Sequence, residues 1–131
     1  MESSYFANGK VYAWEETFAV VKSKQPIAGA FAVIQDKNEV TVVLQENKIG
    51  EYQQDILEIS LGWNIITFDM LLPLNMVGFI GALASALANE GIDVLTFSAY
   101  STEHVLVQSK DLGKALGALE RLGCAIQWKN M

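Results

Sequence analysis

The stretch that decides the fold is residues 63–108, which read WNIITFDMLLPLNMVGFIGALASALANEGIDVLTFSAYSTEHVLVQ. Its first part, residues 63–70, is rich in β-branched and aromatic side chains, so it predicts a strand. Pro73 follows closely, and a proline has no backbone N–H to donate to a strand ladder. The strand is therefore expected to end before Pro73.

A helix is predicted to follow this strand, over residues 76–89. Asn75 stands where a capping side chain is preferred, and large apolar residues recur along one stripe of the helix. Most of its other residues are Ala, Gly or Ser, which let a helix lie close to a sheet. Gly91 favours the left-handed conformation that ends a helix.

The remaining elements of the second half complete a recognisable order. Residues 92–99 and 105–107 predict two strands of a hairpin, joined by the polar turn 100–103. Asp111 is expected to cap an amphipathic helix with leucines at helical spacing, and residues 125–128 predict a closing strand. The order β-α-β-β-α-β is the ferredoxin-like arrangement.

The first half predicts a shortened copy of the same unit. Residues 17–22 predict a strand, and residues 30–35 and 40–45 predict a hairpin. Only the five residues 25–29 separate the strand from the hairpin, so the first helix of the unit has no room. Residues 47–57 have room for one short helix.

The two halves therefore indicate an internal duplication. An offset of 64 residues places Phe31 on Leu95 and Glu39 on Glu103, which gives both hairpins one plan. A half without its first helix leaves part of its sheet uncovered, and an exposed apolar sheet of that size is a liability. We expect the other half, or a second copy of the chain in a homodimer, to cover it.

Composition and charge exclude several classes of protein. The net charge is −6 and the nine Lys and Arg residues are scattered, which argues against nucleic acid and anionic membranes as partners. Pro73 and Asn75 interrupt the apolar run 70–88, which favours a strand, a turn and a buried helix over a membrane span. A single cysteine and the absence of signal-peptide features in the first five residues indicate a cytoplasmic location.

The sequence offers little support for catalysis. His104 and Cys124 are the only residues of their types, and they are twenty positions apart without an orienting partner in the pattern. No Walker-type phosphate loop, dinucleotide fingerprint or metal-ligand spacing occurs, so we expect no catalytic residue, cofactor or metal. His104 is expected to be a solvated hairpin residue and Cys124 a buried structural one. Glu39 and Glu103 are expected to be surface carboxylates.

The second half resembles a known family. Residues 74–80 and 83–94 resemble the first strand, helix and second strand of ACT domains. Residues 97–107 resemble the short bacterial tandem-ACT proteins, which are related to the ACT repeats of the cytosolic arginine sensor of animals. The resemblance implies an α+β fold of two ferredoxin-like βαββαβ halves packed together. Residues 1–61 would be the shortened ACT-like half and residues 62–131 the complete one.

The resemblance also implies a function. Members of the family are mostly ligand-sensing regulatory modules without catalytic activity, and many bind amino acids where two ACT units meet. Their first turn commonly carries Asp or Asn followed by Pro-Gly. Here Asn75 stands for the acid, Val77 replaces the proline and Gly78 matches the glycine. These departures leave an alternative open, namely a module that has lost its ligand and assembles with itself or with a partner enzyme.

The candidate site joins the start of the helix to the end of the second strand. The first amides of a helix lack intrahelical partners, and the helix dipole favours a ligand carboxylate near them. The hydroxyls after the second strand are available to a ligand's amine or side chain. Without a ligand, the two segments are a helix cap and a polar turn. The candidate ligand-binding residues are Asn75, Met76, Val77, Gly78, Phe79, Ser98, Ala99, Tyr100, Ser101 and Thr102.

Overall fold

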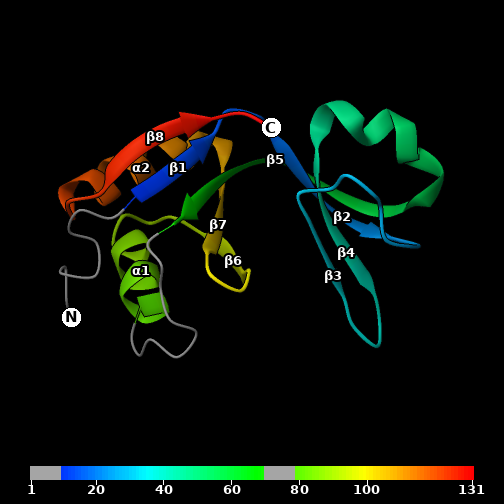
Figure 1. Ribbon diagram of the computed structural model, residues 1–131, viewed down its shortest axis with the longest axis horizontal. Helices are drawn as coiled ribbons and strands as arrows, with labels where there is room; N and C mark the ends of the chain where they lie inside the picture. Colours follow the sequence, from blue (N-terminus) through cyan, green and yellow to red (C-terminus); the bar gives the residue numbers. More distant parts are fainter. Residues whose placement is uncertain (1–9, 70–78) are drawn as a thin grey trace. The chain divides into compact units, whose positions relative to one another are not determined.

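The computed structural model describes residues 10–69 and 79–131 of the chain. Two compact units are present (Figure 1). We call Glu16–Trp63 the inserted unit, because it interrupts the split unit, which consists of the residues up to Glu15 and Asn64–Met131. The sequence predicted residues 1–61 as the first half, whereas the residues up to Glu15 belong here with Asn64–Met131. The origin of the two halves in a duplication stays a prediction.

The split unit has the predicted order of elements, and its α+β class is confirmed. Its sheet has the strand order β8-β1-β5-β7-β6. The last residues of the long strand β5 supply the first strand of the β-α-β-β-α-β order, as the sequence predicts. The elements are β1 (Lys10–Trp14), β5 (Ile56–Phe68), α1 (Phe79–Ala88), β6 (Val94–Ser98), β7 (Glu103–Gln108), the 3₁₀ turn η3 (Ser109–Asp111), α2 (Leu112–Arg121) and β8 (Ala125–Lys129).

Strand β1 was not predicted from the sequence. It lies between β5 and β8, antiparallel to β5 and parallel to β8, as Figure 1 also shows. Val11 and Ala13 are fully buried, whereas Tyr12 and Trp14 alternate onto the opposite face of the sheet. The strand therefore completes the core of the split unit with a segment far away in the sequence.

Helices α1 and α2 cover one face of this sheet. Leu83 and Leu87 of α1 and Leu119 of α2 pack into one core cluster with Ile66 and Phe68 of β5. The apolar stripes predicted from helical spacing are therefore the buried faces of both helices. Gly91, with a φ of 74°, has the left-handed conformation predicted for the end of α1. The predicted cap at Asp111 is wrong in one respect, because its side chain makes no capping hydrogen bond and η3 leads into the helix instead.

The inserted unit has a four-stranded sheet that matches β6, β7, β5 and β8 of the split unit, but it lacks a counterpart of β1 and of the first helix. Its strands follow the order β3-β4-β2-β5, and all neighbours in it are antiparallel. The short helix predicted for residues 47–57 is present as a 3₁₀ helix two residues shorter at its end. The elements are β2 (Phe18–Ser23), β3 (Ala32–Gln35), β4 (Val40–Gln45) and η2 (Glu46–Asp55), followed by the first residues of β5.

A loop residue covers the inserted sheet where the helix is missing. Ile27, which connects β2 to β3, is only 3 % exposed and packs with Val21 and Val42 in the second core cluster. Ile49 and Tyr52 of η2 pack against the same cluster. The loop covers this face only in part, because Val33 of β3 and Ile59 of β5, which pair with the buried Val42 and Val21, are 40 % and 43 % exposed. The expected uncovered apolar surface is therefore present beside the loop.

The two hairpins match at an offset of 63 residues, so the predicted offset of 64 is wrong. Gln35 pairs with Val40 at the end of β3–β4, and Ser98 pairs with Glu103 at the end of β6–β7. Four residues form the turn in each hairpin. A shift of one residue moves every side chain to the other face of a strand. Val40, and not Glu39, is therefore the counterpart of Glu103.

Candidate functional site

The described part of the predicted site is the β6–β7 turn. Ser98 is the last residue of β6, and residues 99–102 connect it to β7. Phe79 is the first residue of α1. Residues 75–78, with the candidates Asn75, Met76, Val77 and Gly78, lie outside the described residues.

The turn is closed by its own backbone. The N–H of Ala99 donates to the carbonyl oxygen of Thr102 over 2.9 Å. Tyr100 is 81 % exposed and Ser101 is also exposed, whereas Thr102 is half-buried. The three hydroxyl-bearing side chains of the turn are therefore accessible to different degrees, and Thr102 is the one that the fold holds.

Glu103 is a buried carboxylate, so the prediction of a surface carboxylate is wrong. The residue is 7 % exposed, and the hydroxyl of Ser98 donates to its Oε1 over 2.5 Å. Removal from water raises the pKa of Glu103, and the hydrogen bond from Ser98 opposes this rise. Glu103 alternates with Thr102 and His104, and shares the helix-covered face of β7 with Val105 and Val107.

His104 belongs to a chain of hydrogen bonds and is not the solvated residue that was predicted. Its Nδ1 lies 2.8 Å from Oγ1 of Thr67 on β5, and its Nε2 lies 3.2 Å from Oγ1 of Thr102. The indole N–H of Trp14 donates to the same Thr67 oxygen over 2.8 Å. The ring of Phe97 lies 5.0 Å from the imidazole, and burial lowers the pKa of His104. The face of the sheet away from the helices thus carries a continuous polar chain that ends at the turn.

A second set of contacts fixes the end of β5. The hydroxyl of Tyr12 donates to Oδ2 of Asp69 over 2.9 Å, and the N–H of Asp69 donates to the carbonyl oxygen of Lys10 over 3.0 Å. The ammonium of Lys129 lies 3.9 Å from the centre of the Tyr12 ring, a cation–π geometry. The hydrogen bond to Asp69 raises the pKa of Tyr12. Strand β1 therefore holds the residue from which the chain enters the predicted ligand turn.

Cys124 is a structural cysteine, as the sequence predicts. It is buried in the core of the split unit, and burial raises the pKa of its thiol to about 11. Arg121, the nearest basic residue in the sequence, pairs with Glu90 at 3.3 Å. A thiol in this setting lacks the electropositive surroundings of a reactive cysteine.

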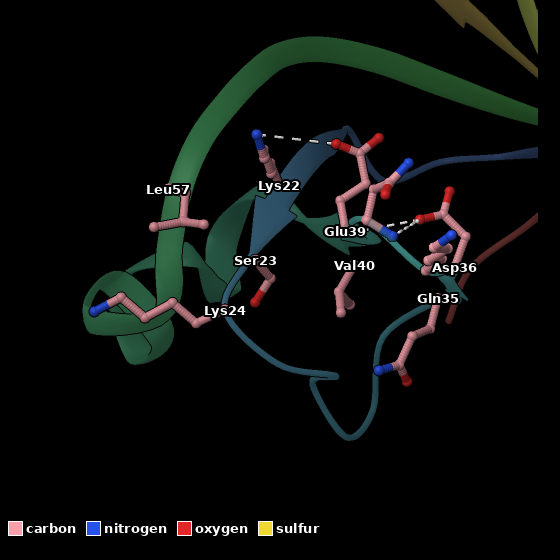
Figure 2. Close-up of a pocket in the computed structure, with 10 residues that line it drawn as sticks. Lys22, Ser23, Lys24, Gln35, Asp36, Glu39, Val40 and Leu57 are labelled. Atoms are coloured by element: carbon pink, nitrogen blue, oxygen red, sulfur yellow. Dashed lines mark hydrogen bonds and ion pairs between the residues drawn. The ribbon is translucent and has the colours of Figure 1, made fainter.

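The inserted unit has an open groove between the end of β2 and the β3–β4 turn, the counterpart of the β6–β7 turn (Figure 2). Its volume is about 300 Å³. Figure 2 shows Lys22 directed at Glu39, 3.9 Å away, and Lys22 also lies 3.6 Å from Glu58. The carboxylate of Asp36 accepts the backbone N–H groups of Asn38 and Glu39, which lowers its pKa. Sequence reasoning identified this turn only as a hairpin connection. The lining residues are Lys22, Ser23, Lys24, Gln35, Asp36, Lys37, Asn38, Glu39, Val40 and Leu57.

The described residues hold neither a cluster of metal ligands nor a membrane-spanning helix. Within residues 10–69 and 79–131, no three His, Cys, Asp or Glu side chains gather in a way that would hold a metal ion. In the same part of the chain, every helix is too short or too polar to span a membrane.

Comparisons with known families agree with this fold. Residues 58–121 match the ACT domain. The matched segment begins within β5 and includes α1, β6, β7 and α2. No curated protein matches the chain in sequence.

Solved structures from several bacteria share the fold over most of the chain. A protein from Agobacterium tumefaciens is 21 % identical with a TM-score of 0.76, covering 95 % of this chain and 96 % of its own. A Vibrio cholerae protein described as a possible transport protein has the same identity and TM-score, covering 92 % and 94 %. The regulatory subunit of aspartate kinase from Thermus thermophilus is 9 % identical with a TM-score of 0.63, covering 88 % and 97 %. These similarities confirm the ACT-like, ferredoxin-like fold.

Proposed function

We propose that this protein is a regulatory module of the ACT type that binds a small ligand, an amino acid, and has no catalytic activity of its own. The match of residues 58–121 to the ACT domain supports this proposal, as does the likeness in fold to a regulatory subunit of aspartate kinase. The module would act in the cytoplasm without a cofactor, as a homodimer or with a partner protein. Neither a nucleic acid nor a membrane is part of the proposal.

The ligand site of the proposal combines the start of α1 with the β6–β7 turn. The observation that supports it is that β5 and β6 end, and β7 begins, at the same end of the sheet. The hydrogen bond between Thr67 and His104 places the end of β5 beside the start of β7, and Ser98 pairs with Glu103 there. Strand β5 ends here at Phe68, and α1 begins at Phe79. In the proposal, residues 75–79 receive a ligand carboxylate, since helix N-termini favour anions, and residues 98–102 bind another part of the ligand.

Regulation would follow from coupled binding. A ligand that binds one arrangement of the ACT units more tightly shifts the population toward that arrangement, and its differential affinity sets the size of the response. The enzyme or other protein that receives the signal would be a separate chain.

The proposal is tested by thermal unfolding in the presence of each of the twenty amino acids at millimolar concentration. A ligand at a hundred times its Kd adds about 2.7 kcal/mol to stability, which raises the midpoint by about 10 °C for a chain of this size. Gly78→Val should abolish the shift, because the added side chain blocks the approach of a ligand to the turn. Gly113→Val is the matched control, since no atom lies within 4 Å of a Cβ added at this exposed helix position.

The results separate the two classes of function. One responding amino acid whose shift is lost in Gly78→Val establishes the sensor and its site. A response that Gly78→Val leaves unchanged moves the site elsewhere on the chain. A flat panel contradicts the sensor and favours the alternative, a protein-interaction module without a ligand.

A further inference from the structure

The hydrogen-bond chain on the helix-free face has a fixed direction. It runs from Trp14 through Thr67 and His104 to Thr102, and thus joins three strands to the β6–β7 turn. An indole N–H can only donate, whereas a hydroxyl donates one proton and accepts through its lone pairs. Trp14 is therefore always the donor at the first link.

The direction of the second link follows from the burial of Thr67. Thr67 is 4 % exposed, and Trp14 and His104 are its two side-chain partners among the described residues. Because its oxygen accepts from Trp14, the hydroxyl proton of Thr67 is satisfied when it points at Nδ1 of His104. If His104 carried its proton on Nδ1, the hydroxyl proton of Thr67 would remain buried without a partner, which is costly.

The third link follows from the tautomer of His104. A neutral imidazole has one N–H donor and one acceptor nitrogen. With Nδ1 accepting from Thr67, the proton of His104 lies on Nε2 and is donated to Oγ1 of Thr102. The hydroxyl proton of Thr102 is then directed away from His104 and is left for another acceptor.

We propose that Trp14 acts as a positioning residue that makes Thr102 a hydrogen-bond donor, so that the β6–β7 turn binds the second oxygen of the carboxylate that the start of α1 receives, in preference to the ammonium group of the ligand. This inference rests on the proposed function and gives the hydroxyl of Thr102 a defined role. The carboxylate of Glu103 does not compete there, because it lies on the helix-covered face and accepts the hydroxyl of Ser98. The core neighbours of that face are Val105 and Val107.

The first test measures the tautomer directly and needs no variant. His104 is the only histidine of the chain, so ¹⁵N-histidine labelling gives one Nδ1 and one Nε2 signal in long-range ¹H–¹⁵N spectra. We expect chemical shifts of the Nε2–H tautomer at a pH where the ring is neutral. Signals of the Nδ1–H tautomer would overturn the inference, whatever the ligand.

Two tryptophan variants test the role of Trp14. In Trp14→Phe, the oxygen of Thr67 is free to accept from Nδ1, so the ratio of the two tautomers should move toward Nδ1–H by about 10-fold, the worth of one buried hydrogen bond. Trp63→Phe is the matched control, since Trp63 also donates its indole N–H to a hydroxyl, that of Ser60, over 2.9 Å. An unchanged tautomer in folded Trp14→Phe, or an equal change in Trp63→Phe, would contradict the positioning role.

Ligand binding tests the consequence at Thr102. For the amino acid that responds in thermal unfolding, Thr102→Val should weaken binding by about 10-fold or more, because the lost donor faces a charged acceptor, and Thr102→Ser should restore it. The same amino acid without its carboxylate, as the corresponding amine, should bind wild type and Thr102→Val alike. An amine that loses affinity in Thr102→Val would overturn the inference. If no amino acid responds, the proposed function fails, while the tautomer still decides the direction of the chain.

Discussion

The hairpins β3–β4 and β6–β7 have the same register and different chemistry. At matching positions, β3–β4 carries Val40 where β6–β7 carries the buried Glu103, and Thr41 where β6–β7 carries His104. Burying a carboxylate or an imidazole costs free energy unless it is hydrogen-bonded. In the split unit, a hydrogen bond with Ser98 offsets the cost for Glu103, and hydrogen bonds with Thr67 and Thr102 offset it for His104. The inserted unit has neither buried group at these positions.

The comparison shows how two similar sheets divide their roles. The inserted unit has a loop where the split unit has a helix, and apolar Val40 where the split unit has the buried Glu103, which favours its stability. The split unit has two helices on one face of its sheet and a chain of hydrogen-bonded polar side chains on the other face. Buried polar residues that cost stability are candidates for function, and their presence in the split unit agrees with the ligand site proposed there.

The largest expected effect tests whether Ile27 of the loop contributes as much to the core of its unit as a buried leucine of a helix does. Ile27→Ala should destabilise the protein by about 2–5 kcal/mol, as should Leu87→Ala in α1, because both side chains are almost completely buried. Val33→Ala, at an exposed position of β3, should cost much less. Urea unfolding measures all three. An effect of Ile27→Ala as small as that of Val33→Ala would show that the loop does not replace the helix.

A medium effect tests the turn that both units share. Gly29 and Gly91 each lie three residues before the second strand of their unit, with φ values of 82° and 74°. Nothing lies within 4 Å of a Cβ added at either position, so only backbone strain opposes alanine. Each Gly→Ala variant should lose about 1–2 kcal/mol in urea unfolding. Gly50→Ala is the control without a positive φ, and unequal losses at Gly29 and Gly91 would break the likeness of the two turns.

The smallest effect concerns the pH dependence of stability, which should have opposite signs in the two hairpins. The raised pKa of Glu103 means that stability falls as pH rises from about 4 through that pKa. The lowered pKa of Asp36 means that stability is present above about 4 and is lost as pH falls. Unfolding midpoints across pH should therefore lose their fall toward neutral pH in Glu103→Gln, and part of their fall toward acid in Asp36→Asn. Equal profiles of wild type and both variants would contradict the assignment.

Local patterns in the sequence predicted most of the fold. The spacing of apolar residues predicted both helices, and the short connection 25–29 predicted the missing one. Strand β1 escaped because its pairing partners, β5 and β8, are distant in the chain, and four alternating residues carry little signal by themselves. The predicted offset between the two hairpins was wrong by one residue because their sequences are too different to align without the strand pairing.

The candidate site was less accessible to sequence reasoning. The polar turn at 99–102 was predicted from its residue types, but the burial of Glu103 and the bonds of His104 depend on which face of β7 each occupies. Neither Trp14 nor Thr67 was a candidate, because their contribution arises from three strands that meet in space. Alternation within Val11–Trp14 was the only local signal for Trp14, and Thr67 lay in the predicted strand 63–70 without a sign of its hydrogen bonds.

The position of β1 also sets the order in which the chain can fold. Lys10 pairs with Ala125 and Trp14 with Lys129, so β1 is synthesised long before the strand with which it pairs. The inserted unit needs only Glu16–Trp63 and can close its sheet while synthesis continues. Contacts between distant residues slow folding because a long loop must close before they form. The split unit is therefore expected to fold more slowly than the inserted unit, and the polar chain from Trp14 to Thr102 is fixed only after β8 has joined the sheet beside β1.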